Sequence, residues 1–178
     1  MNRVEVHAEE VPLPGWTDSL VAFALTVLDS LGKTNWDLSI LLCNDARIRA
    51  LNARYRALDE PTDVLSFSLG ETVPDEDGDM RYLPGDIVIS LETLQENTRY
   101  FRVNEDEELR RLVIHGILHL DGMDHEDNEP FRPMLRLQEE LVTRLSGTPV
   151  IREGTAPRQE PVNRTEPAIT GGTELKLS

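Results

Sequence analysis

Three of the chain's four histidines fall within the segment HGILHLDGMDH, residues 115–125, and this segment constrains the fold more than any other. Ahead of it, Asn104 is a good helix N-cap, and the four acidic residues that follow meet the positive end of the helix dipole. Apolar residues continue at helical spacing through Ile117, and Gly122 is placed to end the helix in a left-handed turn. The segment therefore predicts a helix with a sharp chain reversal behind it.

The spacing of these histidines predicts a metal site. His115 and His119 lie four residues apart on one helix face, where Cβ atoms are roughly 5–6 Å from each other. Both imidazoles can therefore reach one zinc ion at about 2.0–2.1 Å, and the reversal at Gly122 returns His125 as a third ligand. Three histidines leave the fourth tetrahedral position open to water, as in catalytic zinc sites. We expect one zinc ion per chain, and we interpret the isolated His7 as a packed core residue.

Two acidic residues flank the third histidine. Asp121 and Asp124 could orient a histidine from behind, and Asp124 could also accept a proton from water on the metal. The alternative is that both carboxylates only stabilise the turn. The turn role is favoured for Asp121, and both roles stay open for Asp124.

The periodicity of the remaining chain predicts the fold class. Strand patterns and helix patterns alternate before Ser90, and only helices follow it. The predicted elements are a strand with Val4 and Val6, a helix from Thr17 to Gly32, a central strand from Trp36 to Cys43, a helix from about Asn44 to Ala57, and strands from Thr62 and from Gly85. Residues 70–84 are expected to form an acidic loop. We predict an α/β (α+β) fold with a small mixed sheet of about four strands and about five helices.

Length and composition predict one domain at 1–146 and a disordered polar tail at 147–178. The single cysteine, Cys43, lies in an apolar run, which indicates a buried thiol and a reducing compartment. No signal peptide and no apolar run of membrane-spanning length are present, so a cytoplasmic protein without a membrane partner is expected. A formal charge of −15 counts against a protein that coats DNA or RNA, so any RNA contact must be local.

The histidine spacing also matches the metzincin peptidase pattern HExxHxxGxxH, with one exception. Gly116 stands where such a peptidase carries its general-base Glu, so the base for peptide hydrolysis is missing. A phosphodiester substrate instead requires stabilisation of a charged phosphorane, which calls for a cation near the metal. A metallopeptidase is therefore the weaker alternative.

Three segments in order resemble the YbeY endoribonucleases, a family of bacterial rRNA maturation factors. HGILHLDGMDH resembles the family signature HGxLHLxGYDH, with Met123 in place of Tyr. LNARYRALDEPTDVLSFSLG is similar to LNxxYRxxDxPTDVLSFP, with Ser68 in place of Pro, and PGDIVIS is similar to the strand that follows it. The resemblance spans about Leu38 to Leu145, and neither departure affects a proposed ligand.

The resemblance implies a mixed α/β domain with one zinc ion that hydrolyses single-stranded RNA. It also implies a part in small-subunit rRNA 3′ end processing and in ribosome quality control, with ribosomal RNA and the small ribosomal subunit as partners. The family's functional arginine corresponds to Arg56. A non-catalytic zinc-binding ribosome assembly factor stays open as a second alternative.

Arg56 belongs to a helix that is locally basic on an acidic chain. Between Asn44 and Leu58 four arginines stand against only Asp45, so this helix is the candidate phosphate-binding surface. Ordinary ion pairs are the favoured interpretation for Arg47 and Arg49. Arg54 and Arg56 are about 200° apart on a helix, so both cannot face one cleft. The resemblance selects Arg56 as the cation that could bind the scissile phosphate.

Overall fold

The computed structural model describes residues 1–152 and the backbone of 176–177. Five helices accompany a mixed sheet with the strand order β1-β2-β4-β3-β5. The elements are β1 (Arg3–Ala8), α1 (Thr17–Ser30), β2 (Trp36–Cys43), α2 (Asp45–Arg56), β3 (Val64–Pro74), β4 (Met80–Ser90), α3 (Leu91–Phe101), α4 (Glu105–Leu120), α5 (Pro133–Arg144) and β5 (Lys176–Leu177). The predicted fold of about four strands and five helices is confirmed, and the two-residue β5 adds a fifth strand at the edge of β3.

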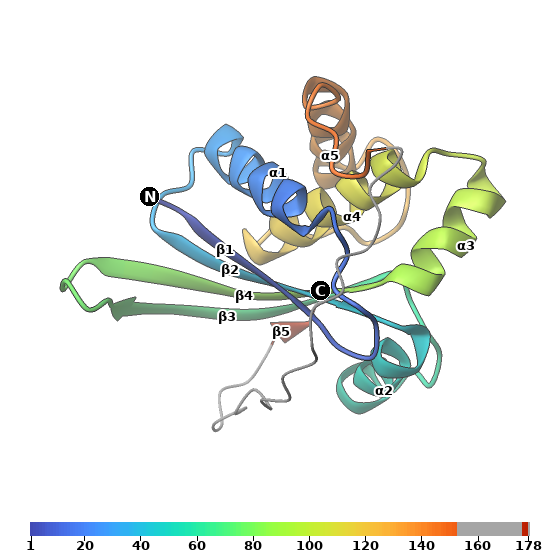
Figure 1. The fold of residues 1–178 in the computed structure, drawn as a ribbon, viewed down its shortest axis with the longest axis horizontal. Coiled ribbons are helices and arrows are strands. Elements are labelled where there is room, and N and C mark those ends of the chain that lie inside the picture. Colours follow the sequence, from blue (N-terminus) through green and yellow to red (C-terminus); the bar gives the residue numbers. More distant parts are fainter. Residues whose placement is uncertain (153–175, 178) are drawn as a thin grey trace.

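The helices divide between the two faces of the sheet, as Figure 1 shows. Strands β1, β2 and β4 run parallel to one another, and β3 pairs antiparallel with β4. Helices α1, α4 and α5 lie over one face, whereas α2 lies against the other. Each face of the sheet therefore packs against its own helices, and each has its own apolar cluster.

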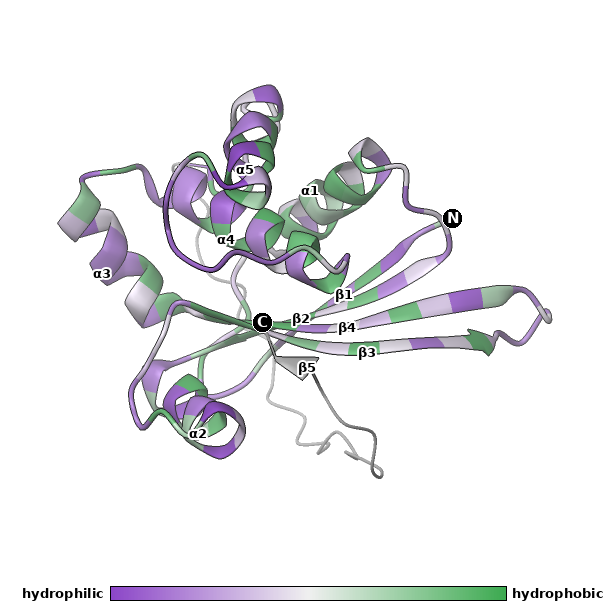
Figure 2. Cartoon of the chain, turned by 180° about the vertical axis from the view of Figure 1, so that it is seen from behind, coloured by the Kyte–Doolittle hydropathy of each residue, from purple (hydrophilic) through white to green (hydrophobic). Residues whose placement is uncertain are grey.

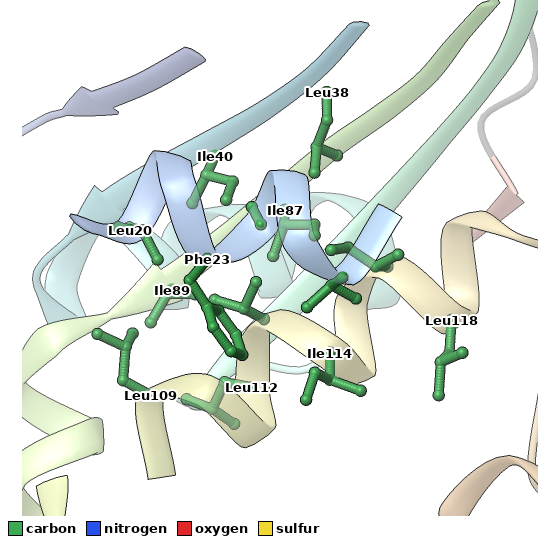
Figure 3. Close-up of a cluster of buried hydrophobic side chains, with 14 of the residues drawn as sticks. Leu20, Phe23, Leu38, Ile40, Ile87, Ile89, Leu109, Leu112, Ile114 and Leu118 are labelled. Atoms are coloured by element: carbon green, nitrogen blue, oxygen red, sulfur yellow. The ribbon is translucent and has the colours of Figure 1, made fainter. Parts of the chain in front are cut away.

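Alternate residues of the central strand β4 supply both clusters. Ile87 and Ile89 point into the larger cluster with α1 and α4, part of which is drawn in Figure 3. Val88, between them, packs with Ile48 of α2 in the smaller cluster. This period-two alternation is what a sheet covered on both faces requires. The helices on the two faces differ in hydropathy. Figure 2 shows that α1 is mostly hydrophobic and α2 mostly hydrophilic.

The prediction of an acidic loop at residues 70–84 is wrong, because most of these residues belong to two paired strands. β3 continues to Pro74 and β4 begins at Met80, so only a short turn separates them. In that turn Asp75 Oδ1 accepts the backbone N–H groups of Asp77 and Asp79, at 3.1 and 3.0 Å. The outer part of β3 is largely exposed, and backbone pairing with β4 defines it. An exposed strand shows little alternation of apolar and polar residues, so its sequence does not reveal it.

Two further expectations need correction. Val150 is fully buried, and the N–H groups of Val150 and Ile151 donate to Asp106 Oδ1 at 2.6 and 2.7 Å. The packed domain therefore continues past the predicted boundary at Gly147; the remainder of the predicted tail, apart from β5, lies outside the described residues. His7 is not a core residue, because its side chain is 61% exposed and its Nε2 atom lies 3.4 Å from Glu5 Oε2.

Cys43 is buried, as predicted, and no other part of the chain contains a cysteine. Burial raises the pKa of its thiol to about 12, so the thiol stays protonated and unreactive near neutral pH. Among the described residues, no helix has the length and apolar character needed to cross a membrane.

Candidate metal centre

The helix that carries two of the histidines begins and ends as its sequence predicts. Asn104 caps α4, its side-chain oxygen accepting the N–H of Asp106 at 2.8 Å. At the other end Gly122 has φ +86°, and the Met123 N–H donates to the Leu118 carbonyl at 3.0 Å. This left-handed reversal is a geometry that glycine adopts without strain. It turns the chain back toward the face of α4 that carries the histidines.

The three histidines meet at one point. The Nε2 atoms of His115 and His119 lie 3.0 Å apart, and one ligand atom from each of the three rings lies within 4.8 Å of the others. The His125 ring centroid is 5.2 Å from that of His115 and 5.3 Å from that of His119. Tetrahedral zinc places its ligand nitrogens roughly 3.3 Å apart, so the two helical histidines already have nearly the required separation.

The hydrogen bonds behind the rings aim the ligand atoms at one another. His119 Nδ1 lies 3.0 Å from the Met123 carbonyl oxygen, and His125 Nδ1 lies 3.0 Å from that of Asp127. Carbonyl oxygens only accept, so both Nδ1 atoms carry the proton and both Nε2 atoms present lone pairs. The third ring, His115, is backed by Gln138 Oε1 at 2.7 Å. Ring nitrogens that converge in this way could hold a metal ion between them, and the donor set fits zinc.

Burial keeps the two helical histidines neutral. It lowers the pKa of His115, and burial together with the neighbouring His115 lowers the pKa of His119 to about 4. The carboxylates of Asp63 and Asp124 act in the opposite direction on His115 with smaller effect. Both rings are therefore in the deprotonated state that metal binding requires at neutral pH.

The two acidic residues beside the third histidine shape the turn. Asp121 forms an ion pair with Lys33, a residue outside the turn. Asp124 Oδ1 accepts the backbone N–H of His125 at 2.8 Å and lies 4.0 Å from His119 Nδ1, with its side chain 81% exposed. The closest partners of the three Nδ1 atoms are thus two backbone carbonyls and Gln138, a residue that the sequence analysis missed. The available signal was a polar residue in phase with the buried Met134 and Leu141 of α5.

Gly116 faces the sheet. A Cβ atom at this position would lie 2.7–2.9 Å from side-chain atoms of Ile87 on β4. Real Cβ contacts do not approach this closely, so a glutamate could not be accommodated here without moving the helix away from the sheet. The missing peptidase base therefore reflects the close packing of α4 on β4.

An open hollow of about 490 Å³ lies beside the histidines. His119 forms part of its wall, and Trp36 and Tyr82 contribute aromatic rings whose centroids are 5.1 Å apart. Ser68 and the turn at Gly122 complete the lining together with Leu120 and Asp121. A ligand larger than water can thus reach the neighbourhood of His119.

The arginines of α2 differ in their contacts. Arg47 pairs with Glu9 at 2.7 Å and Arg49 with Asp59 at 2.9 Å, as favoured from the sequence. Arg54 lies 5.1 Å from the Tyr55 ring centroid. Arg56 is exposed at the last position of α2, and within the described part of the chain no hydrogen bond or ion pair engages its side chain. Helices α2 and α4 lie on opposite faces of the sheet (Figure 1).

Comparison with known proteins places this arrangement in a family. The family model described as endoribonuclease YbeY matches residues 4–146. The endoribonuclease YbeY of Treponema pallidum is 49% identical over 142 residues, which cover 80% of this chain and 89% of the relative. That of Treponema denticola is 47% identical over 153 residues, covering 85% and 98%, and that of Aquifex aeolicus is 40% identical over 130 residues, covering 72% and 83%.

A solved structure agrees with the sequence matches. The solution structure of a Thermotoga maritima protein has a TM-score of 0.51 to this chain at 27% identity, and the match covers 81% of this chain and 89% of that one. The family match includes both helices of the histidine site, the strands beneath them and the basic helix α2. The chain therefore belongs to the endoribonuclease YbeY family.

Proposed function

We propose that this protein is a zinc-dependent, single-strand-specific endoribonuclease that holds one zinc ion per chain on His115, His119 and His125. The observation that carries the proposal is the convergence of these rings, with Nε2 atoms 3.0 Å apart on the two helical histidines. The relatives named above are called endoribonucleases, which supports RNA as the substrate.

The chemistry divides between the ion and the chain. When bound, zinc supplies a Lewis acid that polarises a phosphoryl oxygen and acidifies a water molecule near neutral pH. The three imidazoles would hold the ion and would leave it accessible to the substrate. The hollow beside His119 gives room for the nucleotides next to the scissile phosphate. Arg56 would bind an RNA phosphate through its fork of donors, since no acidic partner among the described residues occupies that fork.

The cellular role is an extension of the same proposal. We place the activity in small-subunit rRNA 3′ end processing and ribosome quality control in the cytoplasm, with ribosomal RNA and the small subunit as partners. The support is family membership together with the chain's charge of −15, which disfavours indiscriminate binding of nucleic acid. The exposed Arg54 and Arg56 supply the local positive charge that such a protein needs to touch RNA.

Two alternatives remain as outcomes of the test. A metallopeptidase is disfavoured because Gly116 packs on Ile87 and leaves no place for its general base. A non-catalytic assembly factor would use zinc for folding alone, and it would bind ribosomes without cleaving RNA.

The test is cleavage of a defined, end-labelled single-stranded RNA by zinc-loaded wild type and by His119→Ala, purified side by side. The proposal expects cleavage by the wild type, none by the variant, and no hydrolysis of casein by either. Equal cleavage by both would point to a contaminating nuclease and would overturn the proposal. Casein hydrolysis would favour the peptidase, and ribosome binding without cleavage would favour the assembly factor.

A further inference from the structure

The three histidines differ in what holds them. Two of them, His119 and His125, are backed by backbone carbonyls of their own turn. His115 alone depends on a side chain from another helix, Gln138 of α5, whose Oε1 lies 2.7 Å from His115 Nδ1. Gln138 is only 7% exposed, so water does not readily replace it. The orientation of His115 is therefore decided by the orientation of one buried amide.

A second hydrogen bond determines which end of that amide faces the histidine. Gln138 Nε2 donates to Glu139 Oε1 at 3.0 Å. An ionised carboxylate only accepts, so it fixes the NH₂ end of Gln138 on the side of Glu139. The carbonyl end then faces His115, and the proton of the contact must come from Nδ1. His115 Nε2 is left with a lone pair directed at His119.

The carboxylate in turn is held by an arginine. Arg111 of α4 donates through Nε to Glu139 Oε1 at 2.8 Å and through Nη2 to Oε2 at 3.2 Å. The same guanidinium also donates to Glu107 and Glu108, at 2.8 and 2.7 Å, so it is fixed from its own helix. The chain of contacts runs Arg111, Glu139, Gln138, His115, and each donor meets an acceptor.

From this geometry we infer that Gln138 is a positioning residue for the metal ligand His115, and that the Arg111–Glu139 ion pair sets the direction of its amide. The inference rests on the proposed zinc site, because it assigns the reason why His115 presents Nε2 to the ion. Hydrogen-bond partners behind metal-ligating histidines typically affect metal affinity by about 10–100-fold.

The decisive experiment measures zinc affinity, by competition with a chromophoric chelator, on Gln138→Met and Gln138→Glu. Methionine keeps the length but its thioether is only a weak hydrogen-bond acceptor, so zinc should bind about 10–100-fold more weakly. Glutamate still accepts from His115 Nδ1, so Gln138→Glu should lose far less affinity than Gln138→Met, even though its second oxygen would face the Glu139 carboxylate. Gln95→Met, the same change at an exposed position of α3, serves as the matched control.

A spectroscopic readout separates positioning from general damage. Long-range ¹H–¹⁵N spectra of the zinc-free protein should show His115 protonated at Nδ1 in the wild type and in Gln138→Glu, and shifted toward Nε2 protonation in Gln138→Met. Glu139→Gln can present either end of its amide to Gln138, so it should show an intermediate loss of affinity and a mixture of tautomers.

The outcomes are distinguishable from failure of the proposed function. If the wild type itself binds no zinc, the metal site is wrong. If the wild type binds zinc and folded Gln138→Met binds it equally well with His115 still protonated at Nδ1, the positioning role of Gln138 is overturned. Equal losses in the Met and Glu variants would likewise overturn it, because the hydrogen bond would then be irrelevant. If Glu139→Gln binds zinc with wild-type affinity, the Arg111–Glu139 ion pair does not set the direction of the Gln138 amide.

Discussion

The two faces of the sheet differ in how they hold the residues of the proposed chemistry. The α4 face carries the proposed metal ligands, and the α2 face carries the proposed phosphate-binding Arg56. On the α4 face the histidines are aimed by a capped helix, a glycine turn and hydrogen bonds behind the rings, before any metal binds. On the α2 face Arg56 stands at an exposed helix end, and no hydrogen bond or ion pair among the described residues engages its side chain. The comparison indicates that metal binding is prearranged by the fold, whereas phosphate binding by Arg56 depends on the RNA.

The largest expected effect tests the prearranged face. His119→Ala, like His115→Ala or His125→Ala, removes one of three protein ligands and should strip most of the zinc, measured as metal per chain by atomic emission. His7→Ala changes an exposed histidine of β1 and should retain close to one zinc per chain. Full metal retention in any two of the three ligand variants would contradict the site.

A second prediction sharpens the contrast by testing how tightly the α4 face is packed. Gly116→Ala places a methyl group 2.7 Å from Ile87, and overpacking of this kind costs about 1–3 kcal/mol of unfolding free energy. The gain in helix propensity, about 1 kcal/mol, offsets only part of that cost. Urea unfolding of the zinc-free protein measures the net effect.

Gly147→Ala is the control for that measurement, since a Cβ atom there meets nothing within 4 Å. It should leave the urea midpoint nearly unchanged. If Gly116→Ala is as stable as Gly147→Ala, helix α4 has more freedom on the sheet than the structure indicates.

The third prediction tests whether Arg56 on the α2 face binds the phosphate of the RNA. Arg56→Lys should keep fold and zinc but lose on the order of tenfold or more in RNA cleavage, because a lysine ammonium cannot bind a phosphate bidentately. Arg54→Lys, two residues earlier on a different side of the helix, should cost far less. Single-turnover cleavage at one fixed salt concentration compares them. Equal slowing, or none, would mean that the phosphate is bound elsewhere.

The last prediction concerns acid. In the zinc-free folded protein the pKa of His119 is about 4, because burial and the neighbouring His115 disfavour its charged form, whereas an unfolded histidine titrates near pH 6.5. Above about pH 6.5 the group is neutral in both states and contributes nothing to pH dependence. As pH falls from 6.5 toward 4 the unfolded state binds a proton first, so stability decreases.

That acid dependence is measured by urea unfolding at a series of pH values. His119→Asn should flatten the slope between pH 6.5 and 4, and His7→Asn, at an exposed position, should leave it as in the wild type. A wild-type slope in His119→Asn would show that other groups account for the acid sensitivity.

The sequence by itself determined the elements whose cause is local. The α4 cap at Asn104, the reversal at Gly122 and the four-residue spacing of His115 and His119 follow from short-range geometry, and each is present in the structure. The apolar strand that begins at Gly85 and the burial of Cys43 were equally readable, because they depend on which residues avoid water.

Only the tertiary structure decided contacts between residues far apart in the chain. Gln138 lies 23 residues beyond His115 and meets it only because α5 packs on α4. The clash that makes Gly116 necessary comes from Ile87 on a strand, and the burial of Val150 depends on the core that α1, α4 and α5 build together. Periodicity reports which face of an element is buried, but the partner across that face is chosen by packing of the whole domain.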